Sequence, residues 1–326
     1  MNNSKDIIAA KLPNIKTRVY FTLKLLVAIS LLVYLFYFVE LGNIVSTFLS
    51  SNILLLAFSA VLLVPNLYLQ YWKWKITCDK LIGETSRSKI ILSLFYGFPA
   101  AVFTPARAGE YFGRGLAFKD YRISEIIVAT VADKLFTILV TSVIGSIGTI
   151  LFINRYYQSS IYISLPLMIA FFVLAAIAIT FIFSDKEWFY KFFSPLLKFK
   201  LFSKIGERLL ILKNLDRDFA FKMISISTLF FFCYLLQFVI LLAAFANHIE
   251  LGKFLLAAAV ILFAKTILSP ISLSELGVRE GASIFFLTQM GETSSTALNA
   301  SLSLFVINII VPALVGLFLL FVKNDD

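Results

Sequence analysis

Two short stretches of the chain place acids and bases at the same spacing. Residues 105–114 and 270–279 both fit the pattern P-x4-E-x3-R, and the second begins 165 residues after the first. In each stretch a glutamate, Glu110 or Glu275, precedes an arginine by four residues, which puts both side chains on one face of a helix. Guanidinium groups bind phosphate through two parallel hydrogen bonds. The two stretches therefore predict an anion-binding site in which each cation has a nearby carboxylate.

Further charged residues fall within otherwise apolar segments. A charge at the centre of a bilayer costs at least about 2.5–3.5 kcal/mol on insertion scales, so such residues are usually paired or functional. The residues that we predict to line a lipid headgroup-binding cavity are Arg107, Glu110, Arg114, Asp133, Lys134, Lys265, Glu275, Arg279 and Glu280. Phosphate binding is assigned to four of them, Arg107, Arg114, Lys134 and Arg279. The alternative is that these charges only neutralise one another and hold the broken helices together.

Prolines and glycines interrupt both motifs. Pro105 and Pro270 lack a backbone N–H and break helices, while Gly109 and Gly277 permit turns and close backbone approach. Irregular backbone at membrane depth is tolerated only where it is buried or lines a wet cavity. The N-termini of half-helices facing that cavity would add positive dipoles to anion binding. We therefore predict two broken, half-spanning helical segments.

The elements that position these residues are predicted to be transmembrane helices. The chain of 326 residues is 60% hydrophobic with 35 Phe, and its mean hydropathy is +0.91. A helix needs about 20 apolar residues to cross a bilayer. Six runs are long enough, at 21–39, 52–72, 126–152, 161–183, 224–246 and 298–322. The predicted fold is all-α, a single-domain polytopic transmembrane helix bundle over residues 1–326, with six full crossings and two re-entrant or broken segments.

The net charge of +10 is distributed as membrane topology requires and does not indicate nucleic-acid binding. Segments 1–20, 73–89, 107–125 and 184–222 carry four, five, four and nine Lys/Arg, whereas the opposing loops hold only Arg155 and Lys253. Basic loops stay in the cytoplasm, so we expect a multi-pass cell-membrane protein with both termini cytoplasmic. The aromatic and basic connector 184–222 is expected to lie on the cytoplasmic leaflet. Trp72, Lys73, Trp74 and Lys75 are interpreted as an interfacial anchoring belt at the end of the second crossing.

Counting the predicted crossings from the cytoplasmic N-terminus gives the two halves of the chain opposite orientations in the membrane. The segment around Pro105 enters the membrane from the cytoplasm, and the segment around Pro270 enters from outside. Residues 52–152 and 224–322 are therefore predicted to form an inverted repeat, the arrangement of many secondary transporters, whose broken helices meet near the midplane.

Several function classes lack their signatures. Two cysteines and a single histidine, His248, give no framework for a disulfide or metal site. No phosphate-binding loop or dinucleotide fingerprint occurs. We expect no metal and no cofactor, and the sequence does not support an ATP-driven pump.

The motifs resemble the lysylphosphatidylglycerol synthase transmembrane family, also called flippase-like membrane proteins. The matching stretches are residues 104–114, 132–135 and 269–280. The resemblance implies an inner-membrane protein that handles polar lipids, since this domain moves aminoacylated phosphatidylglycerol to the outer leaflet in the best-understood members. Other members accompany polyprenyl-linked sugar metabolism. Many members have Gly at the position of Glu275, and the first motif often has one residue fewer before Arg114.

The leading hypothesis is a flippase-like protein that moves a polar phospholipid or polyprenyl-phosphate lipid between leaflets. In the family a soluble domain performs lysyl transfer, and residues 323–326 offer none, so lysyl transfer is not expected. One alternative is a membrane-embedded transferase with Glu110, Asp133 or Glu280 as general base. The other is an accessory scaffold that recruits a synthase or glycosyltransferase through residues 184–222. The sequence leaves open the lipid, the direction and energy source of movement, and assembly as a homo-oligomer.

Overall fold

The described part of the chain is a bundle of helices. A computed structural model describes residues 41–102, 104, 107–157, 216–268 and 277–323, together with short helical pieces between 165 and 180. The longer helices are α2 (Leu41–Leu49), α3 (Ile53–Val61), α4 (Leu63–Thr77), α5 (Arg87–Val102), α6 (Gly109–Gly113), α7 (Ile123–Tyr156), α11 (Arg217–Ala246), α12 (Leu251–Leu268), α13 (Val278–Gln289), α14 (Ser294–Phe305) and α15 (Val311–Lys323). Short π or 3-10 turns extend three of them, namely η1 (Cys78–Ile82), η2 (Arg114–Ala117) and η6 (Val306–Ile310). No strand occurs among these residues, which confirms the all-α fold.

Five helical stretches in this part of the chain are long and apolar enough to cross a membrane. Four of them, Ile53–Ile82, Ile123–Tyr156, Arg217–Ala246 and Ser294–Val322, overlap crossings predicted from the sequence. The predicted crossings at 21–39 and 161–183 lie wholly or largely outside the described residues. The fifth stretch is α12, which the sequence analysis placed in the broken segment around Pro270. Its 18 residues rise about 27 Å, so it is longer than the half-span expected there.

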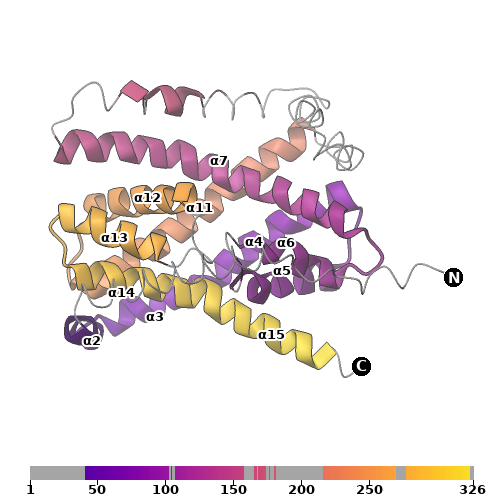
Figure 1. Ribbon diagram of the computed structural model, residues 1–326, viewed down its shortest axis with the longest axis horizontal. Coiled ribbons are helices and arrows are strands. Elements are labelled where there is room, and N and C mark those ends of the chain that lie inside the picture. The colour runs from indigo at the N-terminus through magenta and orange to yellow at the C-terminus, as the bar shows by residue number, and fades with distance from the viewer. Residues whose placement is uncertain are drawn as a thin grey trace, which may run out of the picture.

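The two shorter hairpins approach the middle of the bundle from opposite ends. In Figure 1, α7 and α11 run along the length of the molecule, whereas α12 and α13 occupy its left half and α5 and α6 its right half. Helix α12 packs on α7, and α15 packs on α5. The loops that join α11 to α12 and α13 to α14 lie at the left end, and α15 ends at the right. Helices α5 and α12 therefore both end within the length of the bundle, between its two ends.

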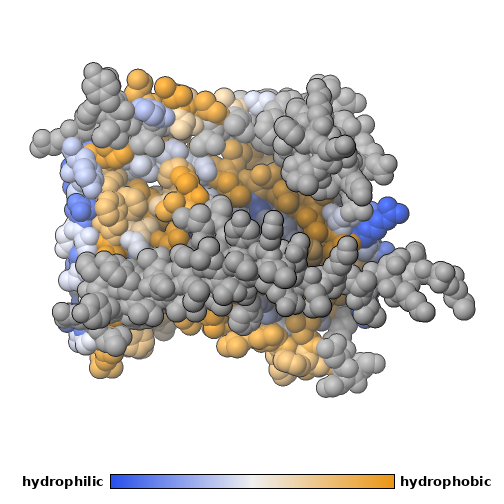
Figure 2. Space-filling model, viewed as in Figure 1, coloured by the Kyte–Doolittle hydropathy of each residue, from blue (hydrophilic) through white to orange (hydrophobic). Residues whose placement is uncertain are grey.

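The outer surface is apolar along the sides of the bundle. Large apolar side chains are exposed there, for example Leu54 at 77%, Phe321 at 70% and Val64 at 69%. Figure 2 shows hydrophobic residues along the sides and hydrophilic ones gathered at the left and right ends. A soluble protein would bury such side chains, whereas a bilayer solvates them. The chain is therefore a multi-pass membrane protein.

Three buried carboxamides join helices from both halves of the chain. The Asn66 side chain on α4 donates to Gln237 Oε1 (3.0 Å) and Asn308 Oδ1 (2.9 Å). Asn308 on η6 donates to the same Gln237 oxygen at 2.9 Å. Polar side chains of this kind hold transmembrane helices together because the surrounding lipid offers no competing partner.

Candidate functional site

A cavity of about 370 Å³ lies between α4, the α5–α6 segment, α7, α11, α12 and η6. Its charged lining residues are Lys73, Arg107, Glu110, Arg114, Asp133, Lys134 and Lys265. Apolar side chains form part of the wall, among them Phe98, Ile138, Phe230 and Leu262. Figure 2 shows hydrophilic residues in a recess between hydrophobic surfaces, right of centre. The cavity has the size of a small-molecule site, for which about 300–1,000 Å³ is usual.

The break between α5 and α6 brings the first motif to this cavity. Helix α5 ends at Val102, and Pro105 lies outside the described residues. The Thr104 hydroxyl donates to the Ala100 carbonyl (2.9 Å) and accepts from the Gly109 N–H (2.7 Å), so one side chain joins both helices. Arg107 adopts a left-handed conformation with φ 57°. A non-glycine residue in that region is strained and must be held by its surroundings, as often happens at functional sites.

Gly109 permits the close return of α6 against α5. A Cβ at this position would overlap the backbone carbonyl of Ala100, and a Cβ at Gly113 would lie 2.5 Å from the Tyr96 carbonyl. Both glycines are buried. The two helices can therefore pack this closely only without side chains at these positions.

Glu110 is the central acid of the cavity. Its carboxylate lies 2.6 Å from Lys134 Nζ, 2.7 Å from Arg114 Nη2 and 3.2 Å from Arg107 Nη2. The residue is only 6% exposed. One carboxylate thus holds three cations, two from its own motif and one from α7.

Asp133 is the second acid and joins Arg114 to α7. Its carboxylate accepts from Arg114 Nη1 at 3.1 Å. The guanidinium carbon of Arg114 lies 4.3 Å above the Trp74 ring, and the Trp74 indole N–H donates to Ser93 Oγ at 3.2 Å. Arg114 is therefore held by two carboxylates and a cation–π contact.

Lys73 belongs to this cluster, contrary to the sequence interpretation. Its ammonium lies 3.4 Å from Asp133 Oδ1 and also bonds to Thr137. Lys73 and Trp74 are 5% and 0% exposed, so the interpretation of these two residues as an interfacial belt is wrong. Trp72, which is 43% exposed, does face outward. The apolar run ends at Trp72, but the helical stretch continues to Ile82, which carries Lys73 into the interior.

The described lining carries a net positive charge. Lys73, Arg107, Arg114 and Lys134 surround the two carboxylates, and Lys265 on α12 adds a fifth cation to the wall. Four cations against two carboxylates leave +2 without Lys265 and +3 with it. At membrane depth such an excess attracts an anionic group.

The second motif contributes less directly to the cavity. Arg279 and Glu280 are both fully buried and paired at 2.7 Å, and neither lines the cavity. The guanidinium also donates to Ser301 Oγ (2.9 Å) and contacts Tyr234 Oη (3.5 Å), and Tyr234 does line the cavity. Arg279 therefore lies behind the wall. Pro270 and Glu275 lie outside the described residues.

Gly277 and Glu280 form the start of α13. Gly277 has φ 82°, a conformation that favours glycine. Its N–H donates to Glu280 Oε2 at 2.7 Å. The acid thus caps the helix N-terminus while it pairs with Arg279, and acids at this end of a helix are stabilised by its dipole.

Neutral polar side chains that the sequence analysis did not assign also line the cavity. They are Gln70, Tyr111, Thr137, Thr141, Tyr234, Thr266 and Asn308. The sequence carries no local signal for most of them, because their convergence depends on how α4, α7, α11 and α12 pack together.

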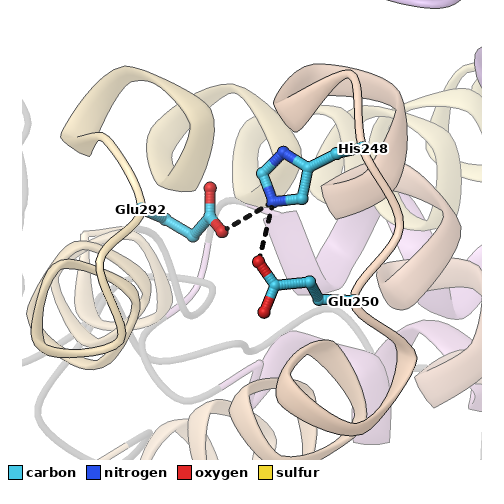
Figure 3. A group of neighbouring side chains, drawn as sticks. All are labelled: His248, Glu250 and Glu292. Carbon is cyan, nitrogen blue, oxygen red and sulfur yellow. Dashed lines mark hydrogen bonds and ion pairs between the residues drawn. The ribbon is translucent and has the colours of Figure 1, made fainter.

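Outside the cavity, His248, Glu250 and Glu292 lie together where the α11–α12 and α13–α14 loops meet (Figure 3). His248 Nε2 lies 3.1 Å from Glu292 and 3.4 Å from Glu250. Lys253 Nζ contacts the same two carboxylates at 2.6 and 2.8 Å, so a cation of the chain already offsets one of their two negative charges. The hydrogen bond from Lys253 holds the pKa of the Glu250 carboxyl below its ordinary value. The arrangement ties the two loops together.

Comparison with known proteins places this architecture in one family. No curated protein matches the chain. The family model described as "Lysylphosphatidylglycerol synthase TM region" matches residues 21–316, which is most of the chain and includes every cavity residue named above. The chain therefore belongs to the family of lysylphosphatidylglycerol synthase transmembrane regions.

Proposed function

We propose that the protein binds the phosphate-bearing headgroup of a polar lipid in this cavity and moves it between the leaflets. The lipid is a phospholipid or a polyprenyl-phosphate lipid, and its acyl or prenyl chains stay in the bilayer. The observation that carries the proposal is the excess of cations over carboxylates in a cavity bounded by membrane-spanning helices. A phosphate would complete the charge balance that Glu110 and Asp133 leave incomplete.

The exposure of the cations indicates which of them would contact phosphate first. The side chains of Lys134 and Arg107 are 23% and 17% exposed, whereas that of Arg114 is 4% exposed. Arg107 and Lys134 both contact Oε2 of Glu110, and a guanidinium or ammonium group carries more N–H donors than this one contact uses. We assign direct phosphate contact to Arg107 and Lys134, together with Lys265 on α12, and we assign Arg114 to positioning Glu110 and Asp133.

The element order supports a transport mechanism. Each half has a long helix, a shorter helix, an interruption, a short helix and another long stretch: α3–α4, α5, α6 and α7, then α11, α12, α13 and α14–α15. Arg114 pairs with Asp133 on α7, and Arg279 bonds Ser301 on α14, the corresponding elements. An inverted repeat with basic loops on the cytoplasmic side of the inner membrane would let the two hairpins exchange access to the cavity.

The transferase alternative is less favoured by the positions of its candidate bases. A general base must reach a substrate proton with a free acceptor. Glu110 and Asp133 are each bound by at least two cations, and Glu280 is fully buried against Arg279. These carboxylates balance charge. A scaffold role through residues 184–222 concerns a segment of which the structure describes only residues 216–222.

Reconstituted vesicles test the proposal. Phospholipids labelled on the acyl chain with a dye that is reduced only in the outer leaflet would report translocation, with phosphatidylglycerol and phosphatidic acid as probes. Replacing both Lys134 and Lys265 by Gln should slow translocation by about tenfold to a hundredfold, the effect of losing one or two hydrogen bonds to a charged group. The matched control is Lys222→Gln, because Lys222 pairs with Asp218 on the exposed side of α11.

Three outcomes separate the candidate functions. An unchanged rate in the double variant would overturn the site assignment. No translocation by the unaltered protein, with product formation from a lipid and a soluble donor in detergent, would favour the transferase. Loss of a partner enzyme on deletion of residues 184–222, with no effect of the cavity variants, would favour the scaffold.

A further inference from the structure

The chemistry of the cavity lining also bears on which headgroup fits, an inference that rests on the proposed function. We propose that the cavity selects headgroups that combine a phosphate with hydroxyl groups, and that it discriminates against headgroups carrying an amine. Glycerol phosphate lipids and polyprenyl-phosphate sugars share the selected chemistry.

The first argument is electrostatic. An ammonium headgroup needs a carboxylate to accept it, yet both carboxylates of the described lining already serve the chain's own cations. Glu110 contacts three cations and Asp133 contacts two. An incoming amine would have to displace a lysine or an arginine, and it would lie among like charges where water screens them little.

Aromatic side chains offer an amine no better site. A cluster of aromatic rings can bind ammonium groups through cation–π contacts. In this cavity Lys134 lies 5.3 Å from the centre of the Tyr111 ring, and Lys265 lies 5.6 Å from that of Tyr234. Both tyrosine rings thus already have a lysine of the chain beside them. A quaternary ammonium headgroup would have to compete with Lys134 and Lys265 for these rings.

The second argument concerns the neutral polar groups. Thr137 and Thr141 lie one turn apart on α7, and Gln70 lines the cavity from α4. The side chains of Gln70 and Thr141 make no hydrogen bond to another residue in the described part of the chain. A threonine hydroxyl and a glutamine amide each both donate and accept, which matches the behaviour of a hydroxyl. These side chains are therefore suited to a glycerol or sugar hydroxyl beside the phosphate.

The third argument is shape. The cavity holds about 370 Å³, which exceeds the needs of a single phosphate. Phe230 and Ile138 flank the polar groups with apolar surface that can accept the carbon face of a polyol or sugar. We call the cations of the lining its phosphate region, and Gln70, Thr137 and Thr141 its hydroxyl region. The hydrogen bond between Lys73 and Thr137 joins the two.

Native mass spectrometry of the purified full-length protein tests the preference without requiring transport. The probes are phosphatidylglycerol, phosphatidic acid, phosphatidylethanolamine, phosphatidylglycerol esterified with lysine, and a polyprenyl-phosphate hexose. Phosphatidylglycerol should bind about tenfold more tightly than phosphatidylethanolamine, and the lysine ester should bind least. Comparing the affinity for polyprenyl-phosphate hexose with that for phosphatidylglycerol shows whether the protein prefers a sugar or a glycerol beside the phosphate.

Thr141→Val and Gln70→Leu test the hydroxyl region separately. Each should weaken phosphatidylglycerol binding by about fivefold, the effect of one neutral hydrogen bond, and leave phosphatidic acid, which has phosphate but no headgroup hydroxyl, unchanged. The matched control is Thr149→Val, since the Thr149 hydroxyl on the same helix bonds the Gly145 carbonyl outside the cavity. An equal loss of affinity for phosphatidylglycerol and phosphatidic acid would overturn the assignment of these side chains to the headgroup hydroxyls.

Binding and translocation together separate this inference from the proposed function. A preference for hydroxyl-bearing headgroups without translocation would overturn transport and support the inference. Translocation of phosphatidylethanolamine or the lysine ester as fast as phosphatidylglycerol would overturn the inference and leave transport standing. Failure to bind any of the lipids would overturn both.

Discussion

The ammonium of Lys73 lies 3.4 Å from the carboxylate of Asp133, and both side chains are almost fully buried. This pair joins α4 to α7 beside the cavity. Asp133 also accepts from Arg114, so the carboxylate stands between a lysine and an arginine that come from different segments. The pair therefore links the first motif to α4 and α7, and it sets the position along these helices at which the cations meet.

Removing Lys73 should destabilise the protein. Breaking one partner of a buried ion pair typically costs about 3–5 kcal/mol because a charge is left buried, and Lys73→Met should fall at the lower end since Arg114 still contacts Asp133. Thermal unfolding in detergent measures the effect. The single variant Asp133→Asn and the double variant complete a double-mutant cycle, which separates the Lys73 contact from the Arg114 contact that Asp133→Asn also weakens. A coupling energy near zero in this cycle would mean that Lys73 and Asp133 are not coupled.

The close packing of α6 on α5 gives a second prediction. Gly109→Ala should lower the unfolding temperature and the amount of folded protein, because the new methyl group would overlap the Ala100 carbonyl. Gly281→Ala is the matched control, since Gly281 lies in α13 with open space around it. That change should be neutral or stabilise the helix by up to about 1 kcal/mol. Equal effects of the two substitutions would contradict the close approach at Gly109.

Long apolar runs made four crossings predictable, and the spacing of Glu110 and Arg114 indicated their pair. The Lys73 contact could not be predicted, because hydropathy marks where an apolar run ends and not where the helix ends. The pair of Arg279 and Glu280 has no signal in helical spacing either, since neighbouring residues point to different faces. They meet because Gly277 starts the helix with φ 82° and Glu280 folds back onto it.

The buried Arg279–Glu280 pair gives a third prediction, one that separates structure from binding. Arg279→Met should cost about 3–5 kcal/mol of stability, because Glu280 would remain charged and fully buried. Ser301→Ala, which removes one hydrogen bond to each partner, should cost about 1–3 kcal/mol. Unfolding temperature and lipid affinity are measured on the same samples. A variant of normal stability with lost lipid binding would place Arg279 in contact with the headgroup instead of behind the wall.

The carboxamide cluster gives the last prediction. Gln237 accepts from Asn66 and Asn308 with one oxygen and donates to the Ser59 carbonyl at 2.9 Å, so it bonds groups from three segments. Gln237→Leu should leave two buried amide N–H groups short of an acceptor and lower stability by about 1–3 kcal/mol. Asn308 lines the cavity while Gln237 does not, so the loss should appear in unfolding temperature before it appears in lipid affinity. The triple replacement of Asn66, Gln237 and Asn308 by Leu removes every orphaned donor and should unfold at a higher temperature than Gln237→Leu. A triple variant less stable than Gln237→Leu would contradict this explanation. It would mean that the hydrogen bonds of the cluster themselves stabilise the helix packing, and that unsatisfied N–H groups do not account for the effect of Gln237→Leu.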